Sequence, residues 1–200
     1  MPNSFTPGEL NHDNLTKQLL IAMPSLQDPS FQRSVTLICE HNKHGAMGII
    51  INQPTSMHVE ELIQQIGHSS TVENKTSPSA NNNPVYAGGP VQMDRGFILH
   101  DSDQQWESTH MVDNDLKLTT SEDILLDIGR GKGPENCIVA LGYAGWSAGQ
   151  LEQELAENVW LTVPYEASIL FNTPIEKRWQ MAAKKLGIDV HLISNQTGHA

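Results

Sequence analysis

The sequence is poor in cysteine, in basic residues and in long apolar runs, and each shortage excludes a class of protein. Two cysteines among 200 residues, Cys39 and Cys137, form no disulfide framework and fit a reducing compartment. Twelve basic residues against 23 acidic ones give a net charge of −11, which argues against nucleic acid or an anionic membrane as partner. No run approaches the ~18 apolar residues of a transmembrane helix. Residues 1–14 also lack the apolar core of a signal peptide, so we expect a cytoplasmic protein.

The length and the apolar content indicate one domain with a full core. A chain of 200 residues with 38% hydrophobic residues can bury such a core without disulfides or a metal. Residues 1–14 are polar and contain two prolines, so we expect a flexible arm there. Residues 68–84 contain almost nothing apolar, and we expect a flexible loop inside a single domain that spans residues 15–200.

Short β-branched runs alternate with amphipathic segments along this domain. Val59, Leu62, Ile63 and Ile66 follow helical spacing, and Gly67 stands where a C-terminal cap belongs. Hairpins mixed with helix–strand–helix units predict an α+β domain with a mixed sheet. We expect strands at residues 18–23, 34–40, 46–52, 85–87, 97–100, 109–112, 116–119, 137–143 and 188–193, a turn at 93–96, and helices at 59–67, 121–129, 147–158 and 173–187.

One motif suggests nucleophilic catalysis. Residues 145–149 read Gly-Trp-Ser-Ala-Gly, which matches the G-x-S-x-G nucleophile elbow and lies between a predicted strand and a predicted helix. Ser147 would then need an acid and a base, which Asp189 with His191 or His199 could supply. The alternative is that Ser147 is an ordinary helix N-cap that accepts the backbone N–H of Gln150. The upstream hairpins favour this alternative, because they do not fit the parallel sheet of that hydrolase fold.

Three other residue groups have a functional and a structural interpretation. Cys39, His41 and His44 could ligate zinc, but no second pair of ligands stands at a recognisable spacing, which favours a buried thiol and turn histidines. Glycines 142, 145 and 149 could offer backbone N–H groups to an anion, although no basic residue follows within the loop. Four basic residues lie on the last predicted helix and could contact nucleic acid, but a solvated helix face is the usual meaning of such a group: Lys177, Arg178, Lys184 and Lys185.

Polar, aromatic and glycine residues gather at the ends of predicted elements, where binding residues concentrate. If these segments converge on one concave face, they form a ligand or partner surface. If they do not, the glycines make turns, Arg33 pairs with an acid and the tryptophan fills core. The residues are Arg33, His41, Asn52, Gly88, Gly89, Asp94, Arg95, Trp146 and Ser147.

Several long blocks of the sequence are similar to the AlgH-like (YqgE) family of bacterial proteins. They are residues 18–52, 86–100, 141–154, 169–179 and the terminal Gly-His-Ala, so the resemblance covers nearly everything outside residues 1–15 and 68–84. The resemblance implies a single α+β domain whose mixed, bifurcated sheet curls into a pseudo-barrel with flanking helices. It implies no established activity, and the AlgH name reflects a regulatory association with alginate production in one bacterial group. The family pattern does not require serine at the position of Ser147.

Together these observations predict a cytoplasmic, non-enzymatic regulatory or ligand-binding protein. The alternative is a small serine hydrolase that uses Ser147. We expect no cofactor and no metal, and a protein or small-molecule partner of unknown identity. The sequence leaves the oligomeric state open and is compatible with a monomer.

Overall fold

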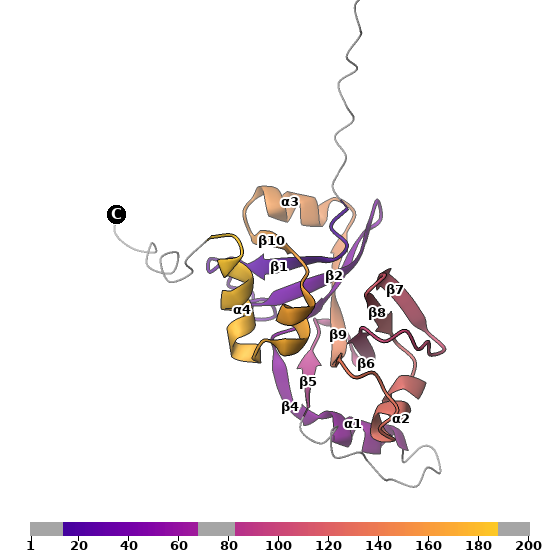
Figure 1. Ribbon diagram of the computed structural model, residues 1–200. Helices are drawn as coiled ribbons and strands as arrows, with labels where there is room; N and C mark the ends of the chain where they lie inside the picture. The colour runs from indigo at the N-terminus through magenta and orange to yellow at the C-terminus, as the bar shows by residue number, and fades with distance from the viewer. Residues whose placement is uncertain (1–13, 68–82, 188–200) are drawn as a thin grey trace, which may run out of the picture.

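The computed structural model describes residues 14–67 and 83–187, and its centre is a strongly curled sheet (Figure 1). The strands are β1 (Gln18–Ala22), β2 (Val35–Asn42), β3 (Gly45–Ile50), β4 (Pro54–His58), β5 (Pro84–Ala87), β6 (Val91–His100), β7 (Thr109–Asp113), β8 (Leu116–Thr119), β9 (Cys137–Ser147) and β10 (Trp160–Pro164). The helices are α1 (Val59–Gly67), α2 (Asp123–Gly129), α3 (Gln150–Ala156), the π-helical turn η1 (Ser168–Asn172) and α4 (Ile175–Lys184).

Strand β9 joins the two halves of the sheet. The strand order is β10-β1-β2-β3-β9-β6-β8-β7, and β4 pairs with β5 beside this path. The first part of β9 pairs antiparallel with β6 and parallel with β5, whereas its last residues, up to Ser147, pair with β3. The sheet therefore splits along β9 and curls into a half-barrel, which confirms the predicted α+β class with a mixed, bifurcated sheet.

Period-two apolar patterning places hydrophobic clusters on both faces of the sheet. On β1, Leu19 and Ile21 point into the largest cluster, which also contains residues of η1 and α4, while Leu20 and Ala22 point into the cluster beneath α3. On β6, Ile98 faces a third cluster that includes α1 and α2 residues. Each fully buried Leu or Ile stabilises the fold by about 1.5–3 kcal/mol. Alternate residues of the same strand therefore pack against helices on opposite faces of the sheet.

Several local predictions are wrong. The turn expected at residues 93–96 is part of β6, where the register against β9 shifts between Val91 and Gly96. Ser147 is the last residue of β9, and α3 has Gly149 in a left-handed conformation (φ 75°) at its N-cap. The helix expected from residue 173 begins at Ile175 with Pro174 as its N-cap, and the Thr173 hydroxyl donates to the Ser168 carbonyl.

The remaining expectations differ in outcome. The sequence pattern does not predict strands β4 and β10, since their apolar residues are few or mixed with polar ones. The arm at residues 1–14 and the loop at residues 68–84 fall almost wholly outside the described residues, as does the strand expected at 188–193. Among the helices that the structure describes, none is long and apolar enough to cross a membrane.

Candidate functional site

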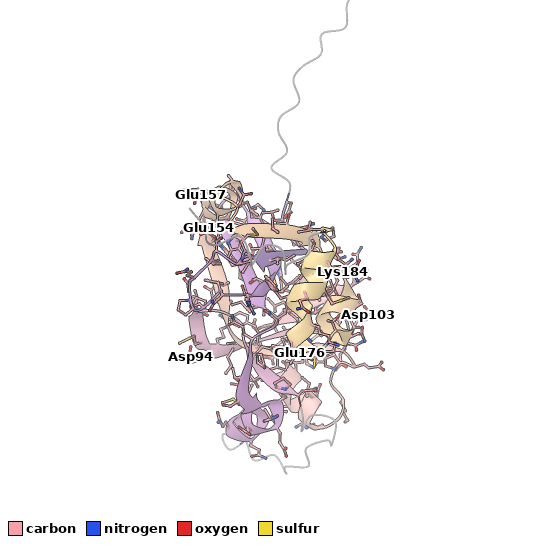
Figure 2. The ribbon with its side chains drawn as sticks, turned by 90° about the vertical axis from the view of Figure 1, so that its left-hand side faces the viewer. Asp94, Asp103, Glu154, Glu157, Glu176 and Lys184 are labelled. Carbon is pink, nitrogen blue, oxygen red and sulfur yellow. The ribbon has the colours of Figure 1, made fainter. Side chains whose placement is uncertain are left out.

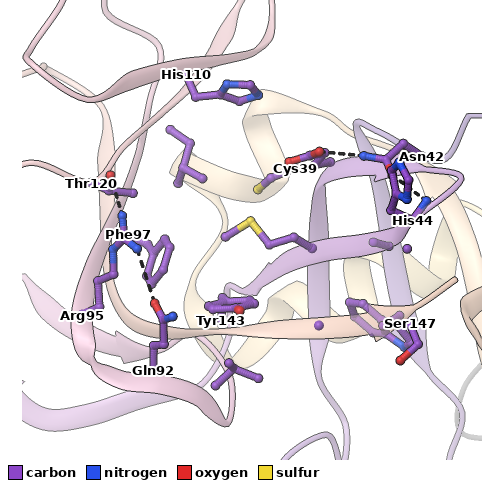
Figure 3. A pocket seen from close by; sticks show the side chains of 18 residues that line it. Cys39, Asn42, His44, Gln92, Arg95, Phe97, His110, Thr120, Tyr143 and Ser147 are labelled. Carbon is purple, nitrogen blue, oxygen red and sulfur yellow. Dashed lines mark hydrogen bonds between the residues drawn. The ribbon is translucent and has the colours of Figure 1, made fainter.

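A cleft of about 640 Å³ opens between the β2–β3 hairpin and strands β6, β7 and β8, and β9 runs along its floor (Figure 3). The two halves of the split sheet therefore supply its two walls. Its lining residues are Cys39, Glu40, Asn42, His44, Gly45, Ala46, Met47, Val91, Gln92, Arg95, Phe97, His110, Leu118, Thr120, Tyr143, Gly145, Trp146 and Ser147.

The floor of the cleft is apolar and aromatic. Phe97 and Tyr143 meet with ring centroids 5.5 Å apart and an interplanar angle of 61°, an edge-to-face arrangement. Met47 is half-buried against the same core cluster. Tyr143, Gly145 and Ser147 reach the cleft because they alternate along β9 and so share one face of the strand. The floor can therefore cover a flat or aliphatic part of a small molecule.

Arg95 places an exposed cation at the edge of this floor. Its Nη1 donates to Gln92 Oε1 at 3.4 Å, its Nη2 donates to Thr120 Oγ1 at 3.3 Å, and its guanidinium lies 5.5 Å from the Phe97 ring centroid. These partners are neutral, and within residues 14–67 and 83–187 no carboxylate forms an ion pair with Arg95. The site thus presents a positioned guanidinium whose charge is not compensated there.

Two histidines lie on opposite rims of the cleft (Figure 3). His110 comes from β7 and is exposed, and His44 is exposed in the β2–β3 turn. Beside His44, Asn42 Nδ2 donates to Glu40 Oε1 at 2.7 Å, and Asn42 Oδ1 accepts the His44 backbone N–H at 2.8 Å. The hairpin rim therefore has its own acid, while the Arg95 rim is the positive side of the cleft.

The cysteine and histidines considered for zinc do not come together. Cys39 is buried, and burial raises the pKa of its thiol to about 12. His41 is turned toward α3: its Nδ1 accepts the Leu15 N–H at 3.1 Å, and its Nε2 lies 2.8 Å from Glu152 Oε1. In the described part of the chain, no group of three His, Cys, Asp or Glu residues is placed to hold a metal ion.

Ser147 does not have the backbone of a nucleophile elbow. It ends β9 opposite Gly45 in the ladder, and its φ is not among the positive values of the described non-glycine residues. Its N–H donates to the Gln150 Oε1 at 2.9 Å, whereas the predicted N-cap bond would run from the Gln150 N–H to the serine, and the N-cap of α3 is Gly149. The proposed acid and bases, Asp189, His191 and His199, lie outside the described residues.

Trp146 lines the cleft wall, but its indole is buried beneath α3. The indole Nε1 donates to Glu154 Oε2 at 2.9 Å, and the same oxygen accepts the Trp160 Nε1 at 2.7 Å. Figure 2 shows Glu154 on α3 and Glu157 directly after it at one end of the molecule. Trp146 therefore attaches α3 to the sheet as well as bordering the cleft.

The cleft is lined by three of the nine surface residues chosen from the sequence: Arg95, Trp146 and Ser147. Asn52 and Arg33 lie together elsewhere, where Asn52 Nδ2 donates to the Arg33 carbonyl at 2.8 Å and Arg33 lies over the Trp179 ring. His41 faces α3, and the exposed Asp94 lies outside the lining although it directly precedes Arg95 in β6 (Figure 2).

Gly88 and Gly89, also outside the lining, have a packing reason to be glycine. A Cβ on Gly88 would lie 2.3 Å from the Gly142 carbonyl oxygen, and one on Gly89 would lie 2.1 Å from the Tyr143 carbonyl carbon. Sequence reasoning missed Phe97, Tyr143 and Thr120 as cleft residues. The alternation of Tyr143, Gly145 and Ser147 along one strand was the signal that pointed to a shared face. Ligand binding by the nine residues stays a prediction.

Comparisons with known proteins agree on one family. A family model described as AlgH-like matches residues 19–191. The chain is 51% identical over 187 residues to a UPF0301 protein of Thioalkalivibrio sulfidiphilus, covering 94% of this chain and 97% of that protein. It is 49% identical over 191 residues to a UPF0301 protein of Dechloromonas aromatica, covering 96% and 100%.

Two solved structures share the fold. The solution structure of the AlgH protein from Pseudomonas aeruginosa superposes with a TM-score of 0.76 at 42% identity, covering 97% of this chain and 100% of that one. A crystal structure of a protein from Corynebacterium diphtheriae has a TM-score of 0.68 at 20% identity, covering 94% and 95%, and shows likeness of fold alone.

Proposed function

The chain belongs to the AlgH-like family, and from this premise we propose that it is a non-enzymatic protein that binds a small molecule in the cleft beside Arg95. The observation that carries the proposal is the pairing of a positioned, uncompensated guanidinium with an aromatic floor. A volume of about 640 Å³ falls in the range of small-molecule sites. The ligand that fits carries an anionic group at Arg95 and a flat or aliphatic part over Phe97 and Tyr143.

The state of the two nucleophile candidates in the cleft supports binding rather than catalysis. The Cys39 thiol is buried and has a raised pKa, so it is protonated at neutral pH. Ser147 lies in an extended strand end rather than on a tight turn. Neither side chain has the activated form that nucleophilic catalysis needs.

The position of the cleft supports a regulatory role. Its walls come from the two halves of the split sheet, so a ligand that contacts both would fix their separation. A partner protein whose binding depends on this separation would respond to the ligand. The two free cysteines, Cys39 and Cys137, fit a reducing compartment, and we place this role in the cytoplasm.

Titration with anilinonaphthalene sulfonate, an aromatic anion, tests the proposal. We expect saturable binding to the wild type and at least about tenfold weaker binding to Arg95→Gln, the equivalent of about 1.4 kcal/mol. Arg130→Gln is the matched control, because it removes the same charge from an exposed residue outside the cleft. Equal affinities of wild type and Arg95→Gln, with both proteins folded, would refute the site.

A further inference from the structure

Arg178 is a buried cation on a helix whose basic residues were expected to face solvent. Only 5% of Arg178 is exposed, so the prediction of a solvated basic face is wrong for this residue. Its Nη1 donates to the Ile51 carbonyl and its Nε donates to the Thr173 carbonyl at 3.1 Å. The guanidinium also lies 5.4 Å from the Tyr86 ring centroid. The residue thus connects α4 to the end of β3 and to the turn after η1.

These contacts satisfy hydrogen bonds but leave the charge of Arg178 uncompensated. Carbonyl oxygens and an aromatic face are neutral, and no carboxylate of the described residues forms an ion pair with Arg178. A buried ion without an opposite charge is costly, which is why buried charges are normally paired. The guanidinium has further N–H groups besides these two, and they are available to an acceptor.

A cavity lies at the buried guanidinium. It has a volume of about 120 Å³, and its lining combines Arg178 and Asn83 with apolar side chains such as Val139 and Leu170. A second cavity of about 550 Å³ adjoins it, because Asn83, Ile128, Cys137 and Phe171 line both. No lining residue of either cavity belongs to the cleft beside Arg95, so the two sites are separate.

The two chambers differ in charge and polarity. The inner one offers the Arg178 cation, and the other described residues that line it are neutral. The outer one is bordered by Gly131, Gly133 and Asn136, and it contains Glu135, the one carboxylate among the described residues that line either cavity. An anionic group therefore fits the inner chamber, and a neutral or cationic remainder fits the outer chamber.

We propose that the cavity at Arg178 is a second binding site, which takes the carboxylate or phosphate group of a small polar molecule. The anion supplies the charge that the buried guanidinium lacks, and a bidentate contact through the free N–H groups fixes its orientation. Asn83, whose side chain carries an amide, also lines the inner chamber. The remainder of the ligand lies in the outer chamber beside Asn136 and Glu135.

Nuclear magnetic resonance titrations of the full chain with inorganic phosphate and, separately, with acetate test this site and distinguish the two anion sources. We expect one of them to give saturable shifts at the Arg178 Nε–H and the Asn83 side-chain amide, with a Kd of about 1 mM or below. Arg178→Gln, which removes the first reporter, should abolish the shift at the Asn83 amide, whereas Arg130→Gln, a loss of the same charge outside both cavities, should retain both shifts. Shifts that do not saturate, or that avoid Arg178 in the wild type, would overturn the proposal.

Two further variants keep the outcome interpretable. Ile128→Phe retains every charge but fills the boundary between the chambers, so it should weaken binding of the anion at least about tenfold. This variant tests the site even if Arg178→Gln fails to fold. Unchanged affinity in folded Ile128→Phe would contradict the site. Arg95→Gln should leave the shifts at Arg178 intact, and Arg178→Gln should leave sulfonate binding in the cleft intact, so either site can fail without the other.

Discussion

Single polar side chains attach the helices to the sheet, and Glu154 is the clearest case. One of its carboxylate oxygens accepts the indole N–H groups of both Trp146 and Trp160, and the other accepts Gln150 Nε2 at 2.9 Å. Phe31 packs against both indoles, with a centroid distance of 5.6 Å to Trp160. Trp146, which the sequence suggests as a binding residue, therefore has a structural role. The acceptor of its indole N–H lies eight residues further along the chain.

Removing this acceptor should destabilise the fold. Glu154→Ala leaves two buried indole N–H groups without a partner, and a buried unsatisfied donor costs about 1–3 kcal/mol. The free energy of unfolding from urea titrations measures the loss. Glu157→Ala is the control just after the same helix, where the carboxylate is exposed and accepts Gln153 Nε2, and it should change stability by less than about 0.5 kcal/mol. Equal losses in the two variants would count against the indole contacts.

His100 makes the fold sensitive to acid. Its side chain is buried with Nε2 2.8 Å from Thr119 Oγ1, and burial, reinforced by the nearby Lys117 charge, lowers the pKa of His100 from 6.5 to about 4. The unfolded chain binds a proton below pH 6.5 while the folded chain does not. The stability contributed by the neutral imidazole is therefore complete above pH 6.5 and falls as the pH drops toward 4, by up to about 1.4 kcal/mol per pH unit.

The comparison of His100→Gln with wild type measures this pH-dependent contribution of His100 to stability. The free energy of unfolding of the variant should depend less steeply on pH between 6.5 and 4, whatever its level at neutral pH. His110→Gln, a substitution of an exposed histidine, should keep the wild-type slope. Parallel curves for wild type and His100→Gln would show that the imidazole titrates normally in the folded protein.

The thiols should be inert in the native protein. Burial raises the pKa of Cys39 to about 12 and, reinforced by the Asp101 charge, that of Cys137 to about 11, so neither forms an appreciable thiolate at pH 8. We expect iodoacetamide to label both quickly only after unfolding in urea. In the native protein, the half-buried Cys137 should react before the buried Cys39. Fast native labelling of Cys39 would contradict its burial.

At the scale of elements, the crossing of the β5–β6 connection over β9 sets the geometry of the split sheet. Gly142 and Gly149 share a left-handed φ of 75°, but a Cβ on Gly142 would lie 2.4 Å from the Gly89 carbonyl oxygen, whereas nothing lies within 4 Å of one on Gly149. Alanine at either position costs about 1–2 kcal/mol for the backbone conformation. Gly142→Ala must also push the two backbones apart.

The paired variants separate the two costs. The free energy of unfolding should fall by about 1–3 kcal/mol more in Gly142→Ala than in Gly149→Ala, because overpacking adds to the cost of the backbone conformation. Urea unfolding of both variants gives the difference directly. Similar losses would mean that the connection yields to the added methyl group and that the crossing is not tightly packed.

Elements with strong periodicity could be predicted from the sequence, and those defined by distant partners could not. The pattern of Val59, Ile63 and Gly67 led directly to α1. Residues 93–96 contain glycine and charged residues typical of a turn. They are nevertheless part of β6, because this strand pairs with β9 on either side of an irregularity in the register. Similarly, β10 is a strand because β1 pairs with it, from Gln18 opposite Pro164 to Ala22 opposite Trp160.

The same distinction applies to the candidate site in the whole molecule. Arg95, Trp146 and Ser147 were chosen because they end predicted elements, and the cleft includes them. Phe97 and Tyr143 were assigned to core strands, because sequence patterning shows which strands are apolar but not where a sheet splits and leaves one strand face open. The cleft exists because β9 changes partner from β6 to β3, and this long-range pairing leaves no local signal.

The central claim, that the cleft binds an amphiphilic anion, is tested most directly by locating such a ligand in solution. Intermolecular nuclear Overhauser effects between bound anilinonaphthalene sulfonate and the full chain give that location. We predict contacts from the aromatic rings of the probe to Phe97, Tyr143 and the Met47 methyl group, and a shift of the Arg95 Nε–H on binding. Saturable binding with contacts only to other surfaces, or no contact to Phe97 and Tyr143 at saturation, would contradict the account.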